Sequence, residues 1–336
     1  MTSQIVSSPG RLCLLGEHCD WAGGHSIAVP LDLRVKARFT PSEGAPVLSV
    51  VSHHIPSGKY LESTYSAPLN PGRFRNRKDP LRYVAATWTV LRHDDVQVGG
   101  GRLELESMLP MGRGFSSSAA LCVATAKALS GDVFGTDFRK IARWATVAER
   151  DLVGIACGAL DPLACAADSA LFIDWSEPTG EASPVQVGEP LHLVAGVFSK
   201  ARDAPGILHA LQEAFAGRAT ETENKCVREA IQGWSILAAE ARTAIQSGAL
   251  SSLGDAMTEA QSIYEERLHG VLPPLTAPGL IRVCKAARQE GALGAKFSGA
   301  GGDGSVVVLV EDEAHVRRMQ KRLAQEGLQS WSTCVR

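Results

Sequence analysis

The segment from Leu109 to Ala120 has residue types that suggest anion binding. It reads Leu-Pro-Met-Gly-Arg-Gly-Phe-Ser-Ser-Ser-Ala-Ala, and the run 119–129 that continues it is rich in Ala and Leu and contains no Gly or Pro. Serine is favoured at helix N-caps. The first amides of a helix lack partners within the helix and lie at the positive end of its dipole. The segment therefore predicts either a phosphate-binding turn or an ordinary capped helix.

A second polar stretch, residues 16–24, lies between two apolar segments and holds Glu17, His18 and Asp20 within four positions. A metal site is one interpretation, but the spacing lacks the H-x-x-x-H pattern of helical metal ligands. Carboxylates accept hydrogen bonds and imidazole can donate them, so a hydroxyl-rich ligand is the second interpretation. A solvated turn is the third. The apolar flanks favour a ligand.

Two further carboxylates of interest follow later in the chain. Glu149 lies in a segment, 137–153, whose apolar residues recur with helical spacing. Asp161 follows a run of small residues and precedes Pro162. An aspartate before proline is most often a turn or cap residue, so the pattern alone gives Asp161 no chemical role.

The segment 294–304 contains three glycines with the spacing G-x-G-x-x-G, at Gly299, Gly301 and Gly304. A dinucleotide-binding fingerprint must open a helix. Here the glycines precede a β-branched run, 305–310. We therefore expect them to join two strands and to approach a ligand or form a tight turn.

The elements that would position these residues are mixed in type. We expect strands at 3–8 and 12–15 with a break at Pro9-Gly10, and at 27–40, 46–53, 102–107, 169–175, 191–198, 305–310 and 329–335. We expect helices at 79–91, 119–129, 137–153, 221–246, 251–269, 277–290 and 312–326. Strands and helices do not alternate regularly. The pattern therefore predicts an α+β fold with helices on largely antiparallel sheets and a domain boundary in the loop 176–190.

Composition narrows the class of protein. The 336 residues are enough for two domains, and 34 basic against 36 acidic residues give a net charge of −2, which argues against nucleic acid or an anionic membrane as partner. We find no signal peptide and no apolar run of the roughly 18 residues that a membrane span needs. The eight cysteines form no C-x-x-C pair, so we expect reduced thiols and a cytoplasmic location. Walker, nucleophile-elbow and protein-kinase motifs are absent from the sequence.

Three stretches together resemble the motifs of the GHMP kinase superfamily, which includes galactokinase, homoserine kinase, mevalonate kinase and phosphomevalonate kinase. They are residues 9–20, 110–120 and 294–304, in the family's order. The first resembles the galactokinase pattern G-R-x-N-L-I-G-E-H-x-D-Y. The run 149–161 is similar to the galactokinase pattern A-E-H-x-x-x-G-x-x-C-G-x-x-D. The third stretch is nearer to mevalonate, uronate and arabinose kinases.

This resemblance implies a two-domain GHMP kinase fold, with a ribosomal protein S5 domain 2-like N-terminal domain at 1–185 and a ferredoxin-like C-terminal domain at 186–336. It implies transfer of the γ-phosphate of ATP, with Mg²⁺, to a hydroxyl of a monosaccharide or sugar acid, at the anomeric position as in galactokinase. It also implies site residues. These are Asp161 and Arg11 for catalysis; Glu17, His18, Asp20 and Gly158 for the substrate; Gly112, Gly114, Ser116, Ser117, Ser118, Ala119, Gly299 and Gly301 for ATP; and Ser118 and Glu149 for Mg²⁺.

The chain departs from the galactokinase pattern at several positions. Cys13 replaces an Asn, Trp21 a Tyr, and Pro162 a Gln. Arg113 stands where a small residue is usual, and either contacts phosphate or faces solvent. The segment 198–203 is either a specificity element or a solvated loop. These departures leave the sugar open.

Two other functions remain open at this point. One is a GHMP kinase with a non-sugar acceptor, such as mevalonate or an amino alcohol. The charges of Glu17 and Asp20 argue against an acceptor that carries a carboxylate, because like charges repel. The other is a non-catalytic relative that senses ATP and sugar. The sequence leaves open whether the protein is a monomer or a homodimer.

Overall fold

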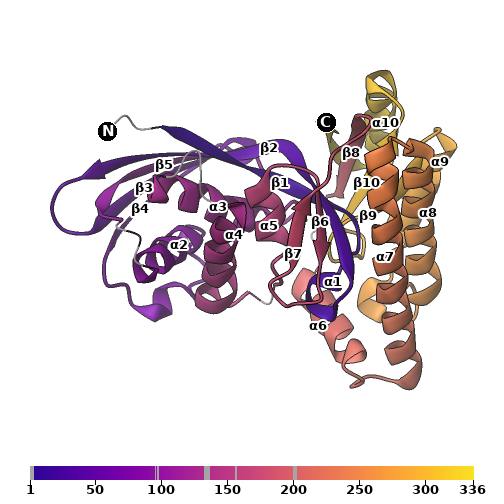
Figure 1. Cartoon of the computed structure of the whole chain (residues 1–336), viewed down its shortest axis with the longest axis horizontal. Coiled ribbons are helices and arrows are strands. Elements are labelled where there is room, and N and C mark those ends of the chain that lie inside the picture. The colour runs from indigo at the N-terminus through magenta and orange to yellow at the C-terminus, as the bar shows by residue number, and fades with distance from the viewer. Residues whose placement is uncertain (1–3, 95, 97, 132–136, 156, 200–202) are drawn as a thin grey trace. The chain divides into compact units, whose positions relative to one another are not determined.

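The computed structural model describes residues 4–94, 96, 98–131, 137–155, 157–199 and 203–336. The chain forms two compact units (Figure 1). The first unit comprises Met1–Arg11, Leu33–Met111 and Phe115–Asp168, and the second comprises Leu12–Asp32, Gly112–Gly114 and Ser169–Arg336. Both units are discontinuous in sequence. The domain boundary at 185/186 stays a prediction.

The first unit contains a mixed sheet. Strand β3 (Val47–His54) pairs antiparallel with β4 (Lys59–Ser66) and parallel with β5 (Gly100–Ser107). Strand β5 pairs antiparallel with residues 35–42 of β2 (His25–Ser42). Along β3, buried residues alternate with more exposed ones, as expected for a sheet with one covered face.

Strand β1 (Ile5–Leu15) pairs with β2 and runs without interruption. The predicted break at Pro9-Gly10 is therefore wrong. Proline fixes φ at a value that extended chain tolerates and removes one hydrogen-bond donor, so it need not end a strand.

The helices of the first unit lie together on one side of its sheet (Figure 1). They are α2 (Arg82–His93), α3 (Ser117–Ser130), α4 (Phe138–Thr146), α5 (Leu160–Ala167), a π-helix (Val147–Val153) and two short 3₁₀ turns (Ile55–Ser57 and Pro71–Arg73). The segment 137–153 was expected to be one α-helix, but Val147–Val153 is π-helical. Glu149 lies in this π-helix and is 3% exposed.

The second unit contains a four-stranded antiparallel sheet. Its order is β11 (Leu328–Val335), β8 (Leu191–Phe198), β10 (Ser305–Val310) and β9 (Gly294–Phe297). All six residues of β10 are buried. A separate pairing joins residues 25–28 of β2 to β6 (Leu171–Asp174), which also pairs with β7 (Glu181–Pro184). Strand β7 lies in the segment that was expected to be a loop.

Helices pack beside this sheet (Figure 1). They are α7 (Glu221–Ser247), α8 (Leu250–Arg267), α9 (Pro278–Gln289) and α10 (Glu313–Gln325), and the unit also contains α1 (Cys19–Ala22), α6 (Ala204–Phe215) and a 3₁₀ turn (Pro273–Leu275). Helix α7 begins with a capping box in which Thr220 and Glu223 each accept a hydrogen bond from the other's amide. The expected C-terminal helices are confirmed, whereas α6 was not predicted.

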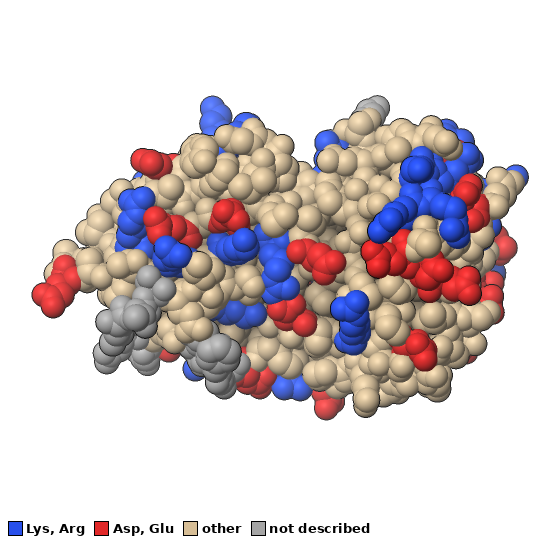
Figure 2. All heavy atoms as spheres, turned by 90° about the horizontal axis from the view of Figure 1, so that it is seen from above, with Lys and Arg blue, Asp and Glu red and all other residues tan. Residues whose placement is uncertain are grey.

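Charges of both signs are interspersed on the face drawn in Figure 2, which agrees with the near-zero net charge of the sequence. Within the described ranges, no helix has the length and apolar character needed to cross a bilayer.

Candidate active site

Asp161 stands at the centre of a hydrogen-bonded cluster in the first unit. The Arg11 guanidinium approaches Oδ1 of Asp161 with Nε at 2.7 Å and Nη2 at 2.5 Å, and the Ser116 hydroxyl donates to Oδ2 at 2.5 Å. The Arg11 side chain is 7% exposed and that of Asp161 is 33% exposed. The carboxylate is therefore fixed from the protein side and still open to an incoming molecule.

Backbone elements bring these three residues together. Arg11 lies on β1, and its amide donates to the carbonyl of Phe115 at 3.3 Å, so the strand is tied to the residue just before Ser116. Asp161 occupies the first turn of α5, where a negative charge interacts favourably with the helix dipole. The sequence suggested a turn or a cap for Asp161, but it lies inside the helix, and Gly158 lies in the segment that leads into it.

The N-terminus of α3 has no ordinary side-chain cap. Ser116 is the N-cap residue, but its backbone is left-handed (φ 56°) and its side chain makes no capping hydrogen bond. Its hydroxyl is bonded to Asp161 instead. Ser117, Ser118 and Ala119 supply the first helical amides, which point outward at the positive end of the dipole.

Glu149 and Ser118 form a second pair in the first unit. A hydrogen bond from Ser118 favours the ionised carboxyl, but burial dominates and raises the pKa of Glu149 to about 7. A carboxylate and a hydroxyl are hard oxygen ligands suited to Mg²⁺, which usually keeps several waters. The residues fit a magnesium ion held largely by a substrate's phosphates. In the parts of the chain that the structure describes, no group of three or more His, Cys, Asp or Glu could hold a metal by itself.

Arg113 anchors the glycine turn to main chain of the second unit. Its Nη1 donates to the carbonyls of Phe198 and Ser199, both at 2.8 Å. The guanidinium therefore does not simply point to solvent. Gly112 has φ 69°, and the side of its backbone where a side chain would start faces open space. The segment Lys200–Arg202 of the suggested specificity loop lies outside the described residues.

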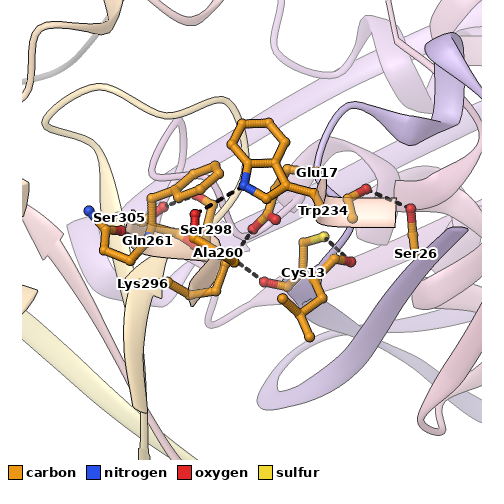
Figure 3. Close-up of polar contacts among 12 residues, drawn as sticks. Cys13, Glu17, Ser26, Trp234, Ala260, Gln261, Lys296, Ser298 and Ser305 are labelled. Carbon is orange, nitrogen blue, oxygen red and sulfur yellow. Dashed lines mark hydrogen bonds and ion pairs between the residues drawn. The ribbon is translucent and has the colours of Figure 1, made fainter. Parts of the chain in front are cut away.

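The loop that carries Glu17, His18 and Asp20 belongs to the second unit. Glu17 is 2% exposed and forms an ion pair with Lys296 of β9, whose side chain is 0% exposed (Figure 3). His18 is the N-cap of α1 with φ 69°, and Asp20 lies in the first turn of that helix. Glu17 and Asp20 were expected to repel an acceptor that carries a carboxylate. Because Lys296 neutralises Glu17, only the charge of Asp20 is left to do so.

The glycine-rich segment joins two strands, as predicted. Strands β9 and β10 are antiparallel neighbours, with Val306 opposite Phe297. Gly299 and Gly301 lie between them with φ 81° and 92°. Two contacts were not foreseen. The sequence assigned Lys296 no role and did not predict the hydrogen bond between Ser116 and Asp161. The Lys296–Glu17 and Ser116–Asp161 pairs both join residues that are distant in sequence, so they depend on tertiary structure.

Three family models match the chain. They are described as GHMP kinases N terminal domain, over residues 82–169, GHMP kinases C terminal, over 241–329, and galactokinase galactose-binding signature, over 2–41. Together these ranges span more than half of the chain.

Two curated relatives named galactokinase are similar to this chain over most of its length. One from Thermococcus kodakarensis is 27% identical over 91% of this chain and 89% of its own length. One from Mycobacterium bovis is 28% identical over 90% of this chain and 88% of its own length. Each aligned region covers most of both chains.

Solved structures share the fold. Lactococcus lactis galactokinase in complex with galactose superimposes with a TM-score of 0.79 at 18% identity, covering 99% of this chain and 93% of that one. L. major mevalonate kinase in complex with R-mevalonate superimposes with a TM-score of 0.76 at 19% identity, covering 100% of this chain and 96% of that one.

Proposed function

This chain belongs to the GHMP kinase family and is a phosphotransferase with a hydroxyl acceptor, and from that premise we propose that it phosphorylates a monosaccharide or sugar acid with ATP. We place the transfer at the anomeric hydroxyl. The relatives named galactokinase and the match to the galactose-binding signature support a sugar as acceptor.

The observation that carries the proposal is the fixed carboxylate of Asp161. Phosphoryl transfer needs positioning and charge stabilisation more than covalent chemistry from the protein. Asp161, oriented by Arg11 and Ser116, accepts or directs the proton of the acceptor hydroxyl. Arg11 stays protonated at all relevant pH values and favours the alkoxide that develops beside it.

The nucleotide's phosphates bind at the start of α3. The amides of Ser117, Ser118 and Ala119 donate to phosphate oxygens without having to reorganise. Gly112 and Gly114 allow the backbone to approach a phosphate, and Gly299 and Gly301 are further residues that we propose for ATP binding. Ser118 and Glu149 would hold Mg²⁺, which would neutralise phosphate charge.

The acceptor binds through the polar loop of the second unit. His18 and Asp20 offer a donor and an acceptor to sugar hydroxyls, and Glu17 and Gly158 complete the proposed set. The buried Glu17–Lys296 pair carries no net charge, so uronic acids belong among the acceptors to be tried.

A panel of acceptors tests the proposal. Purified protein is incubated with ATP and Mg²⁺ and with galactose, other hexoses, arabinose, uronic acids, polyols and mevalonate, and ADP is measured. We expect ADP in the presence of one or more sugars or sugar acids, and phosphorus NMR of the product to show phosphate on the anomeric oxygen. If ADP forms with mevalonate and with none of the sugars or sugar acids, the acceptor is not a sugar and this part of the proposal is wrong. Tight binding of ATP and sugar without turnover would indicate a sensing protein.

A further inference from the structure

Lys296 is a completely buried ammonium group in the second unit. Its Nζ forms an ion pair with Oε1 of Glu17 and donates to the carbonyl of Phe297 at 2.6 Å. It also lies 4.4 Å from the centroid of the Phe297 ring. Glu17 stands 279 residues away in sequence. The pair therefore joins the polar loop directly to strand β9.

A buried ion pair is a weak source of stability. Removing two charges from water is costly, and apolar residues of similar size often stabilise a core as well or better. Fixing one arrangement of the chain is a better attested role for such groups. Glu17 lies immediately before His18 and close to Asp20, so the ion pair would fix the loop that carries these two residues.

Other hydrogen bonds hold both ends of the same loop (Figure 3). The Ser26 hydroxyl donates to the carbonyl of Gly16 at 2.7 Å, and Ser298 donates to the carbonyl of Cys13 at 3.1 Å. On the β9 side, the amide of Phe297 donates to Oε1 of Gln261 at 3.0 Å. Most of these partners are main-chain atoms, so the network fixes backbone positions on both sides of the ion pair.

The residue that the network supports has a strained backbone. His18 is a non-glycine residue with φ 69°, a conformation that persists where the surrounding structure holds it. Its ring lies 5.7 Å from that of Trp21 and 6.2 Å from that of Trp234, which itself packs 5.1 Å from Phe297. Lys296 and its neighbour Phe297 therefore support the His18 loop electrostatically and by packing.

We propose that Lys296 is a positioning residue for sugar recognition, which acts by holding Glu17 and with it the His18–Asp20 loop. The inference rests on the proposed function, because it assigns that loop to the acceptor. Lys296 itself contacts neither the sugar nor ATP. Its loss changes the kinetics of the acceptor and leaves those of the nucleotide unchanged.

Steady-state kinetics of four full-length variants test the inference, with the sugar that the wild type phosphorylates best. The variants are Lys296→Met, Glu17→Gln, the double variant, and Lys285→Met, which replaces an exposed lysine of α9 as a control. We expect Lys296→Met to lower kcat/KM for the sugar at least tenfold while KM for ATP stays within twofold. The control should match the wild type.

The double variant separates positioning from stability. It leaves no unpaired charge, so its Tm should return towards that of the wild type. Its kcat/KM for the sugar should equal that of Glu17→Gln, because Lys296 acts through Glu17. If Lys296→Met does not fold, this comparison alone tests the proposal.

Three results would overturn it: a kcat/KM for Lys296→Met within twofold of the wild type, recovery of both Tm and kcat/KM in the double variant, or additive losses from the two single changes. The wild-type assay keeps the two proposals apart. If the wild type phosphorylates no sugar, the proposed function fails and this inference fails with it. If the wild type is active and Lys296→Met is equally active, only the inference fails.

Discussion

The hydroxyl of Ser116 donates a 2.5 Å hydrogen bond to Oδ2 of Asp161. This bond connects the N-cap of α3 to the first turn of α5, so the proposed phosphate-binding turn and the proposed catalytic carboxylate are adjacent in one hydrogen-bonded unit. Arg11 completes the arrangement from β1. The relative position of a phosphate and an acceptor hydroxyl would therefore be set by short contacts rather than by a flexible loop.

Replacing Asp161 with Asn should abolish most of the activity. Asn keeps the shape and can still accept from Arg11, but it cannot take a proton, so we expect kcat to fall by about 10²–10⁴. Circular dichroism and nucleotide binding should match the wild type. Turnover close to the wild-type rate would remove Asp161 from its proposed role.

Ser116→Ala should reduce kcat with little loss of stability. It removes a charge-assisted hydrogen bond that orients Asp161, and we expect a decrease of about tenfold or more. Ser130→Ala, at the other end of α3, is the matched control because its hydroxyl bonds only to Lys127 of its own helix among the bonds described. Equal activity of both variants would mean that the Ser116 bond does not matter for turnover.

Glu149→Gln should stabilise the metal-free protein at high pH and remove Mg²⁺-dependent turnover. Burial raises the pKa of Glu149 from 4.5 to about 7. Below pH 4.5 the group is protonated in both folded and unfolded chains and costs nothing. Between pH 4.5 and 7 the unfolded chain ionises first, so the wild type loses stability as pH rises, and above pH 7 the loss is complete.

Urea unfolding of both proteins from pH 4 to 8 measures this effect. We expect the difference in unfolding free energy to grow from near zero to at most about 3 kcal/mol in favour of the variant. ADP formation by the same variant should fall at least a hundredfold. A stability difference that does not depend on pH would contradict the assignment.

Arg113→Lys and Arg113→Gln should weaken nucleotide binding to a similar extent. Lysine keeps the charge but lacks the planar guanidinium that reaches two carbonyls at once. If Arg113 acts by holding the turn, both changes should raise KM for ATP several-fold. If it acts as a charge on phosphate, only Arg113→Gln should do so. Arg317→Gln, on the exposed face of α10, is the control.

Thiol labelling should distinguish two classes of cysteine. Cys157, Cys226 and Cys334 are half-buried, and the other five are buried. Burial raises the pKa of Cys284 to about 12 and holds the pKa of Cys122 well above its usual value, which suppresses the reactive thiolate. Mass spectrometry after brief maleimide treatment should find at most three labels on the native protein and eight after denaturation. Prompt labelling of Cys122 would be inconsistent with the fold.

Sequence patterns located the site segments because each depends on local chemistry. Glycine, serine and β-branched residues indicated the α3 turn and the β9–β10 connection, and the two carboxylates and the histidine indicated the polar loop 16–24. Their proposed chemical roles came from the family resemblance. The paired contacts could not be foreseen, because Glu17 and Lys296 are distant in sequence and no local pattern links them.

The errors in the predicted elements have physical causes. Strand β1 continues through Pro9-Gly10 because it is held by pairing with β2, which single-residue preferences do not reveal. The π-helix around Glu149 is only seven residues long. Over so short a segment, the spacing of apolar residues does not distinguish a π-helix from an α-helix. Strands β4 and β7 were missed because both consist largely of half-buried or exposed residues.

Arg113 donates its hydrogen bonds to the main-chain carbonyls of Phe198 and Ser199. Every amino acid has such a carbonyl. Positions 198 and 199 can therefore change identity without loosening the turn that they secure. The hold on the glycine turn therefore depends on the path of the main chain at the end of β8 and not on which side chains it carries.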